Sequence, residues 1–472
     1  MRKTKIICTI GPACENVGTL KEMMKSGMNV ARFNFSHGTH EEQQRKLELV
    51  KQARKELDTT VATMLDTKGP EIRLIDIQSG SATLKEGNEF ILTTEEILGT
   101  EKRVSITYKN LVNDLKPGDT VLIDDGLIEL CVEKVESTEI HCKVVHGGPI
   151  SNHKGVNVPG VHLTMPYVSD VDRDDVIFGC KLGFDFLAAS FVRCKEDILE
   201  LRKILEEHDS HMQIIAKIEN MEGIHNLDEI IEVSDGIMVA RGDMGVEIPF
   251  SEVPILQKRM IKKVVMAGKH VITATQMLES MIHNPRPTRA EATDVANAIY
   301  DGTTGIMLSG ESAAGQYPVE AVRTMAELAE RTERDIDYKS RMRRYEAECG
   351  DCDDITQSLS RAVCSIAMEI GAAAILPVTL SGSTARQVSR YKPDCEIIGC
   401  AVKARVCRQM NLYWGVTPLE IAEAENTDEL FEIAVETALK KGYIKKGDKV
   451  VITAGIPLGV SGKTNMIKVI EA

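Results

Sequence analysis

Short apolar runs that alternate with amphipathic segments constrain the fold of this chain more than any other feature of its sequence. Eight runs have the length and composition of buried strands, and they lie at Lys5–Ile10, Asn29–Phe35, Val61–Leu65, Asp185–Phe191, Gln213–Ile218, Gly236–Ala240, His270–Thr275 and Gly305–Leu308. Amphipathic segments such as Thr39–Leu57 and Val253–Ala267 separate most of them. Near-continuous apolar strands that alternate with helices are typical of a parallel sheet covered by helices. Eight such units predict an α/β fold, a (β/α)8 TIM barrel.

Two further segments predict additional domains, as expected for a chain of 472 residues, which exceeds the size of a single core. Between residues 70 and 167 the apolar runs are short and separated by turns, for example Glu89–Thr93 and Glu139–Val145, which indicates an inserted antiparallel β domain. After a charged stretch at Asp335–Asp354, expected to be a helical connector, strands and helices alternate again and predict a doubly wound α/β domain. The expected units are therefore a barrel at 1–69 and 168–340, a β domain at 70–167, and a C-terminal α/β domain at 341–472.

The charge balance limits the classes of partner. A net charge of −14 repels nucleic acid and anionic membranes, so an anionic substrate would need a local cluster of cations. No apolar stretch approaches the ~18 residues of a transmembrane helix. The first apolar run, Ile6–Ile10, ends at Gly11-Pro12 and is too short for a signal peptide. We expect a cytoplasmic protein with no nucleic-acid and no membrane partner.

Polar residues are arranged on one face of the second predicted strand, in the RFNFSH segment that begins at Arg32. Because side chains alternate along a strand, Arg32, Asn34 and Ser36 share one face and the two phenylalanines the other. A solvent-exposed edge strand is the alternative, and it fits poorly with a sheet covered on both faces. Asp66-Thr67 ends the third strand, and alone it is equally typical of an ordinary turn. Beside Asn34 and Ser36, these oxygens predict a site for a monovalent cation.

Two later strands end in charged residues. Lys217 and Glu219 point the same way, and burying both charges in a barrel is costly unless they are used, although a structural salt bridge is the alternative. Glu219 is a hard oxygen ligand suited to magnesium, and Lys217 is a point charge suited to a phosphoryl group. Gly242-Asp243 forms a turn at a helix start, where backbone N–H groups can bind an anion and Asp243 offers a second metal ligand. For Thr275 the sequence favours an ordinary helix N-cap.

A hydroxyl-rich turn opens a helical segment, Ala385–Tyr391, in the C-terminal domain. Backbone amides and hydroxyl groups of this kind form a candidate phosphate site, with simple helix capping as the alternative. The candidate effector ligands are Thr379, Ser381, Gly382, Ser383 and Thr384.

Nine motifs, taken in order, resemble those of the pyruvate kinase family. They are CTIGP, RFNFSHG, LDTKGPEIR, GVNVPG, KIEN, MVARGDMGVEIP, ATQMLESM, PRPTRAE and LSGESAAG. One such motif would be a weak signal, but the ordered set is specific, and the departures are small, with Phe33 and Met244 where leucine is commoner. The resemblance implies transfer of a phosphoryl group from phosphoenolpyruvate to ADP, giving pyruvate and ATP in the last step of glycolysis. It also implies Mg2+ (or Mn2+) and K+ as cofactors, a homotetramer, and a β-barrel-like lid over the barrel mouth.

The same resemblance implies roles for individual residues. The catalytic residues would be Lys217, Arg32 and Thr275, with Thr275 organising a water that protonates the enolate. Residues that would bind phosphoenolpyruvate are Arg32, Lys217, Gly242, Asp243 and Thr275. Residues that would meet the nucleotide are Asn34, Phe35, Ser36, His37, Arg73 and Lys154. Magnesium would be held by Glu219 and Asp243, and potassium by Asn34, Ser36, Asp66 and Thr67.

Two regulatory expectations also come from the resemblance. The region of the hydroxyl-rich turn binds sugar-phosphate activators in the family, so we expect a sugar phosphate or AMP as an allosteric effector. Relatives with lysine at the position of Glu71 tend to work without potassium, so the glutamate here predicts potassium dependence. The alternative is that Glu71 is a solvated residue of the lid hinge.

Two other functions compete with this interpretation. A lyase on another phosphoenolpyruvate- or pyruvate-binding barrel would use the same metal carboxylates but would need neither the β lid nor the potassium ligands. A catalytically inactive homologue that serves as a regulatory binding module should have lost charged site residues, and all those named above are present. ADP-dependent formation of pyruvate separates the alternatives.

Overall fold

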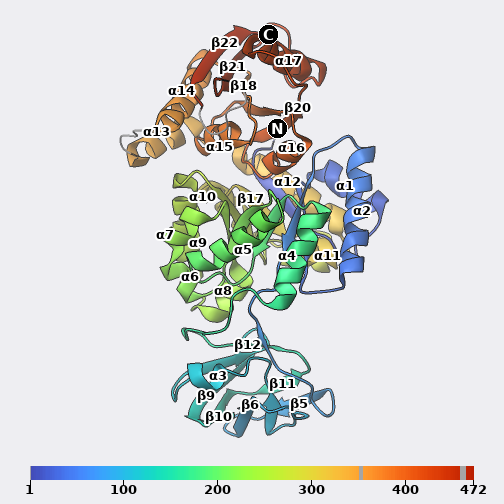
Figure 1. Ribbon diagram of the computed structural model, residues 1–472, viewed down its shortest axis with the longest axis vertical. Coiled ribbons are helices and arrows are strands. Elements are labelled where there is room, and N and C mark those ends of the chain that lie inside the picture. Colours follow the sequence, from blue (N-terminus) through green and yellow to red (C-terminus); the bar gives the residue numbers. More distant parts are fainter. Residues whose placement is uncertain (1, 350–353, 458–463) are drawn as a thin grey trace.

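Eight parallel strands close into a barrel at the centre of the molecule, in a computed structural model that describes residues 2–349, 354–457 and 464–472 (Figure 1). In chain order the strands are β1 (Lys5–Thr9), β2 (Val30–Asn34), β3 (Ala62–Asp66), β13 (Phe186–Ala189), β14 (Gln213–Ile218), β15 (Gly236–Ala240), β16 (His270–Ala274) and β17 (Gly305–Leu308). Each pairs in parallel with its neighbours, and β1 closes the ring against β17. The predicted barrel is therefore confirmed, with strand ends that differ by at most two residues from those expected.

Helices surround the barrel and pack their apolar faces on its outer surface. They are α1 (Val17–Ser26), α2 (His40–Glu56), α4 (Asp170–Leu182), α5 (Lys195–Glu207), α6 (Met221–His225), α7 (Leu227–Val233), α8 (Arg241–Glu247), α9 (Val253–Met266), η1 (Glu279–Ile282), α10 (Arg289–Asp301), α11 (Gly310–Ala313) and α12 (Pro318–Glu333). Sequence signals set their starts: Thr39 forms a capping box with Glu42, and Ser169 caps α4. The outward-facing Phe33 packs edge-on against Phe184, with ring centres 5.2 Å apart. The other face of β2 is therefore available for polar groups.

The inserted domain is a β structure with its own apolar core. Its sheet has the order β4-β12-β8-β9-β10-β6-β7, mainly antiparallel, and β5 and β11 form a separate pair. The elements are β4 (Ile72–Arg73), β5 (Ser81–Leu84), β6 (Glu89–Thr93), β7 (Arg103–Ser105), α3 (Leu111–Asp114), β8 (Thr120–Ile123), β9 (Ile128–Val135), β10 (Glu139–His146), β11 (Gly148–Ser151) and β12 (Gly155–Asn157). The antiparallel insertion after the third barrel strand is confirmed.

The C-terminal unit is a five-stranded sheet with helices on both faces. Its elements are α13 (Tyr338–Cys349), α14 (Ile355–Ile370), β18 (Ala374–Pro377), α15 (Ser383–Arg390), β19 (Glu396–Ala401), α16 (Ala404–Met410), β20 (Val416–Glu420), α17 (Thr427–Lys440), β21 (Lys449–Ala454) and β22 (Met466–Glu471). The strand order is β20-β19-β18-β21-β22, with only β22 antiparallel. The doubly wound architecture is confirmed, and residues 350–353 of the expected connector lie outside the described part of the chain.

The C-terminal unit lies at the end of the barrel opposite the β domain (Figure 1). Arg408 Nε pairs with Asp185 Oδ1 at 2.8 Å, and Leu412 is buried with the residues that fill the barrel interior. The carboxyl ends of the barrel strands therefore face the β domain. Among the described residues, no helix is both long enough and apolar enough to span a membrane.

Candidate active site

A cavity of about 760 Å³ lies between the carboxyl ends of the barrel strands and the β domain. Its lining includes Arg73 and Lys154 from the β domain and Phe191 and Asp243 from the barrel. A cavity of this size, with charged groups from two domains, suits small charged ligands.

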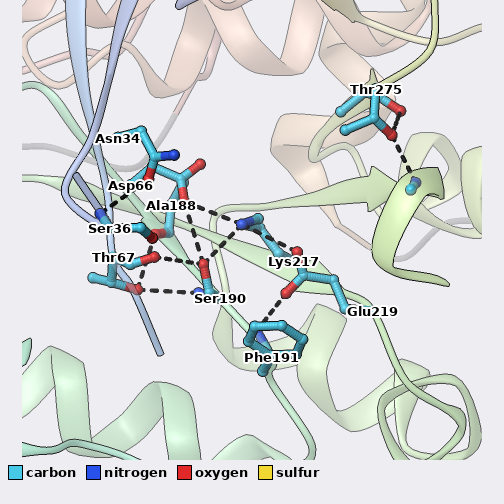
Figure 2. Close-up of polar contacts among 12 residues, drawn as sticks. Asn34, Ser36, Asp66, Thr67, Ala188, Ser190, Phe191, Lys217, Glu219 and Thr275 are labelled. Atoms are coloured by element: carbon cyan, nitrogen blue, oxygen red, sulfur yellow. Dashed lines mark hydrogen bonds and ion pairs between the residues drawn. The ribbon is translucent and has the colours of Figure 1, made fainter. Parts of the chain in front are cut away.

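A buried network of charges lies at these strand ends (Figure 2). Asp66, only 1% exposed, is its centre: its Oδ2 accepts from Arg32 Nε at 2.6 Å, and its Oδ1 lies 3.1 Å from Lys217 Nζ. Lys217 Nζ also donates to Ser190 Oγ at 2.7 Å and lies 3.1 Å from Glu219 Oε1. Strands β2 and β14, with β3 and β13 between them, thus bring together the Arg32, Lys217 and Glu219 side chains that the sequence singled out.

The network sets the charge state of its members. Burial raises the pKa of Asp66, but Arg32 and Lys217 outweigh it and hold this pKa below its usual range. Burial likewise lowers the pKa of Lys217, yet Asp66 and Glu219 raise it above that of a free lysine. Lys217 is therefore a fixed ammonium group throughout the physiological range.

Glu219 differs from its neighbours because its charge is incompletely compensated. Burial, together with the nearby Asp243, raises the pKa of Glu219 to about 8. Its Oε2 accepts from the Phe191 N–H at 2.6 Å, but Oε1 is buried and has no hydrogen-bond partner in the described part of the chain, despite its ion-pair contact with Lys217. An orphaned carboxylate oxygen beside a second carboxylate fits the donor set of a hard divalent cation.

The predicted ligands of a monovalent cation lie together on two adjacent strands. The register pairs Asn34 of β2 with Asp66 of β3. Asn34 Oδ1 accepts from the Ser36 N–H at 3.1 Å, and Thr67 Oγ1 accepts from the Ser190 N–H at 3.1 Å (Figure 2). Oxygen atoms from all four predicted residues are thus gathered at one corner of the strand ends.

Thr275 has a different local structure from the N-cap that its sequence favours, and that interpretation was wrong. Its φ of 64° lies in the left-handed region, which is strained for a β-branched residue, and η1 begins only at Glu279. Its Oγ1 accepts from the Gly242 N–H at 2.7 Å. Arg241 Nη2 donates to the Thr275 carbonyl at 2.6 Å and Arg241 Nε to the Ala274 carbonyl at 3.2 Å. Such strain, clamped from outside, is typical of functional positions.

The residues predicted to bind the nucleotide come from two places, the β domain and the segment at the end of β2. Arg73 Nη1 donates to the His153 carbonyl at 2.8 Å, and Lys154 Nζ lies 2.7 Å from Asp124 Oδ1. The Phe35 side chain packs edge-on against Phe184 with ring centres 6.1 Å apart, so only its backbone can face a ligand. The neighbouring Ser36 is half-buried and His37 is exposed.

Glu71 is ion-paired rather than simply solvated. Its Oε2 lies 2.6 Å from Arg73 Nη2 and also accepts from Arg73 Nε, and both residues line the large cavity. The carboxylate therefore partly neutralises an arginine that is expected to bind phosphate.

The hydroxyl-rich turn in the C-terminal domain is tightly folded. Thr379 Oγ1 accepts from the Gly382 N–H at 3.0 Å, and Gly382 has a φ of 87°, where an added Cβ would lie 2.9 Å from Tyr413 Oη. Thr384 Oγ1 lies 3.0 Å from Thr464 Oγ1. The exposed Ser381 and half-buried Ser383 complete the turn at the start of α15.

Three residues of the site were missed by sequence reasoning. Ser190 joins Lys217 to Asp66, and Phe191 has a φ of 54° that directs its N–H to Glu219. Arg241, which holds the turn at Thr275, lies in the segment MVARGDMGVEIP but was not predicted to be functional. A serine and a phenylalanine at the end of a buried strand carry no distinctive sequence signal. An arginine directly after an apolar strand does carry one, because arginine is rarely buried without a partner.

Comparisons with known proteins show which family this chain resembles in sequence and in fold. The family model for the pyruvate kinase barrel domain matches residues 1–322, and that for the pyruvate kinase alpha/beta domain matches residues 357–470. A pyruvate kinase of Geobacillus stearothermophilus is 51% identical over 99% of this chain and 80% of its own length. One of Clostridium acetobutylicum is 50% identical over 99% of both chains. The crystal structure of a pyruvate kinase from Cryptosporidium parvum, 39% identical, superposes with a TM-score of 0.95 over 100% of this chain and 96% of its own.

Proposed function

Since this chain belongs to the pyruvate kinase family, we propose that it transfers the phosphoryl group of phosphoenolpyruvate to ADP, giving pyruvate and ATP in the last step of glycolysis. The observation that carries the proposal is the buried Arg32–Asp66–Lys217–Glu219 network beside a cavity lined by two domains. Phosphoryl transfer needs positioning and charge stabilisation more than covalent chemistry by the protein.

The cations of the site address the repulsion between two anionic substrates. Lys217 would contact the transferring phosphoryl group, because its ammonium charge is held in place by Asp66 and Ser190. Arg32 would bind the phosphate of phosphoenolpyruvate and Arg73 that of the nucleotide, for which it lies on the cavity wall. A preorganised charge of this kind stabilises the transition state without reorganisation.

Glu219 and Asp243 would hold Mg2+ or Mn2+, a role supported by the orphaned Glu219 Oε1. The ion would supply positive charge that neutralises phosphoryl oxygens during transfer. Within the described residues, three possible ligand side chains gather only at Glu136, Glu139 and His141 in the β domain, so substrate and water oxygens would complete the set at Glu219. Asn34, Ser36, Asp66 and Thr67 would hold K+.

The strained Thr275 and the Gly242 amide would bind phosphoenolpyruvate together with Arg32, Lys217 and Asp243, and Thr275 would orient the water that protonates the enolate. ADP would meet Arg73, Lys154 and the segment from Asn34 to His37. The β domain would close as a lid over the cavity, which excludes water and prevents loss of the phosphoryl group to hydrolysis.

A coupled assay for pyruvate tests the proposal. Turnover should require ADP, a divalent ion and potassium together, and omission of any one should lower the rate by at least about tenfold. Pyruvate formation that is independent of ADP would contradict phosphoryl transfer and favour a lyase.

We also propose the division into a barrel (1–69 and 168–340), a lid (70–167) and a regulatory C-terminal domain (341–472), and a cytoplasmic homotetramer. The exposed edge strand β22, with Val469 48% exposed, offers a surface for pairing between copies. Light scattering of the purified protein tests the tetramer.

A phosphorylated effector, a sugar phosphate or AMP, would bind at the turn formed by Thr379, Ser381, Gly382, Ser383 and Thr384. The support is the α15 N-terminus, where Gly382 supplies no side-chain cap and backbone amides remain for an anion. Effector soaks that leave this turn empty, together with flat activation curves, would contradict the proposal.

A further inference from the structure

Three side chains that can bind a metal ion lie together in the β domain, outside the large cavity. Glu139 and His141 are two residues apart on β10, so their side chains are on the same face of that strand. Glu136 lies in the turn between β9 and β10, where its N–H donates to the Glu139 carbonyl at 2.8 Å. One ligand atom from each of the three residues lies within 4.8 Å of the other two. None of the three lines the cavity of the candidate active site, so the proposed phosphoryl transfer does not account for them.

The ring of His141 presents an unsatisfied nitrogen to the two carboxylates. Its Nδ1 lies 2.8 Å from Glu89 Oε1, and because a carboxylate accepts hydrogen bonds, a neutral ring carries its proton there and keeps a lone pair on Nε2. That Nε2 is buried and has no hydrogen-bond partner among the described residues. It lies 3.5 Å from Glu139 Oε2 and 3.9 Å from Glu136 Oε2. A doubly protonated ring would leave the Nε2–H without an acceptor, so both charge states leave this atom unsatisfied.

A further group holds the second polar atom of each candidate ligand. Arg103 Nη2 donates to Glu139 Oε1 at 2.8 Å, and Lys134 pairs with Glu136 Oε1. The Oε2 atom of each carboxylate is the one nearer His141 Nε2. Glu89 does the same for the His141 ring through Nδ1. Partners that fix the outer atom of a ligand in this way orient ligands around metal ions, and a carboxylate on the far nitrogen of a histidine is a common case.

We propose that Glu136, Glu139 and His141 bind one divalent ion of the zinc class through Oε2, Oε2 and Nε2, with water as a fourth ligand. Two tetrahedral ligands about 2.1 Å from zinc lie about 3.4 Å from each other. The separations of 3.5 and 3.9 Å from Nε2 to the two oxygens are close to this value. An imidazole nitrogen in the set favours zinc over magnesium or calcium, which take oxygen ligands.

A bound water molecule is the alternative occupant. A water has two protons to donate, whereas a neutral His141 brings three acceptor atoms together, two of them on carboxylates. A cation satisfies all three at once. The ion would join the turn at Glu136 to β10 and, through Glu89, to β6, and would therefore stabilise the β domain. This inference does not depend on the proposed phosphoryl transfer.

Equilibrium dialysis of the metal-free full chain against Zn2+ tests the proposal. Excess Mg2+ is present throughout to occupy the divalent-ion site proposed at Glu219 and Asp243. Wild type should bind one more Zn2+ per chain than His141→Gln. His146→Gln, which changes an exposed histidine on the same strand, is the control and should bind as much as wild type. Equal binding by wild type and His141→Gln, or an equal loss in His146→Gln, would overturn the proposal.

The carboxylate behind the histidine gives a second comparison. Glu89→Ala removes the group that orients the His141 ring and should weaken zinc binding by about tenfold or more. Glu101→Ala removes an exposed glutamate of the same domain and should leave the affinity unchanged. An unchanged affinity in Glu89→Ala would contradict the assignment of Nε2 as the ligand.

Anomalous diffraction from a zinc-soaked wild-type crystal requires no variant to fold. A zinc peak is expected about 2.0–2.2 Å from His141 Nε2 and from an oxygen of both Glu136 and Glu139. Zinc peaks only elsewhere, or at His141 without the two carboxylates, would overturn the proposal.

Discussion

Lys217 shows how the surrounding charges fix the position and the charge state of a single buried residue. Asp66 and Ser190 fix its Nζ, and its ammonium form is favoured although the side chain is buried. Asp66 in turn depends on Arg32, so two cations share one carboxylate, and the remaining carboxylate, Glu219, keeps an oxygen that accepts no hydrogen bond among the described residues, although it lies close to Lys217. The network therefore holds its cations tightly and leaves open a position suited to a metal.

We predict that Lys217→Met lowers kcat by about 100-fold or more, because the preorganised charge that we propose stabilises the transferring phosphoryl group is lost. The measurement is steady-state turnover at saturating Mg2+ and K+. Circular dichroism should show the native fold, since Arg32 still pairs with Asp66. Lys21→Met, which removes a surface lysine paired with Glu56, is the control and should turn over normally. Near-normal kcat in folded Lys217→Met would rule out the assigned role.

A second prediction at this scale concerns potassium. The wild type should lose most of its activity in potassium-free buffer, because the Asn34 and Asp66 corner gathers oxygen ligands and Glu71 adds negative charge nearby. Glu71→Lys should regain potassium-independent turnover, since its ammonium group would supply the missing charge. The measurement is kcat with and without K+ at fixed ionic strength.

Because Glu71 pairs with Arg73, the substitution also releases an arginine, and a control must separate the two effects. Glu71→Gln frees Arg73 without adding a cation, so it should remain potassium-dependent. Potassium-independent wild-type turnover would contradict the prediction. Equal gains in Glu71→Gln and Glu71→Lys would assign the effect to Arg73 instead.

At the scale of elements, the barrel strands carry the groups of the candidate site on their last residues and on the following turns. The turn after β16 is the most strained of these, with Thr275 and Gln276 both at positive φ. Arg241, at the start of α8, bonds to three successive carbonyls of this turn and is anchored by Asp294 at 2.6 Å. One element therefore fixes the conformation of its neighbour.

We predict that Arg241→Gln lowers kcat/KM for phosphoenolpyruvate by about tenfold or more, since Thr275, which we propose binds this substrate, would lose the geometry that Arg241 imposes. KM for ADP should change less than twofold, because ADP is expected to bind at Arg73 and Lys154. Arg259→Gln, an exposed arginine on α9, is the matched control. Unchanged phosphoenolpyruvate kinetics in Arg241→Gln would show that the clamp is only structural.

Elements differed in how well the sequence predicted them. The eight barrel strands were found because buried runs such as Gly236–Ala240 are apolar throughout, and the structure has the same bounds for β15. Short strands of the β domain such as β4 (Ile72–Arg73) were missed because two residues carry no periodicity. The backbone at Thr275 could not be predicted, because its positive φ is imposed by Arg241 and Gly242 from other parts of the chain.

At the scale of the whole molecule, lysines cross the boundary between the barrel and the C-terminal domain. Lys5 Nζ donates to the Val416 carbonyl at 2.6 Å, and Lys3 Nζ donates to the Pro393 carbonyl at 3.0 Å. Both come from the first residues of the barrel unit, and both are almost fully buried. The boundary thus holds ionisable groups in an environment that disfavours charge, which makes its stability dependent on pH.

The last prediction uses this dependence. Burial, with repulsion from Arg2, lowers the pKa of Lys5 from about 10.5 in the unfolded chain to about 7 in the folded protein. Between these values the unfolded state binds more protons, so the destabilisation by the buried ammonium is complete below pH 7 and is relieved as pH rises to about 10.5. The Tm of wild type minus that of Lys5→Met should therefore increase between pH 7 and pH 10, whatever constant penalty arises from leaving the Val416 carbonyl unpaired. Ile6→Met, a buried neighbour without an ionisable group, should show a Tm difference from wild type that does not vary with pH. If the Tm difference between wild type and Lys5→Met also does not vary with pH, Lys5 keeps an ordinary pKa in the folded protein. Polar contacts at the domain boundary would then compensate its charge.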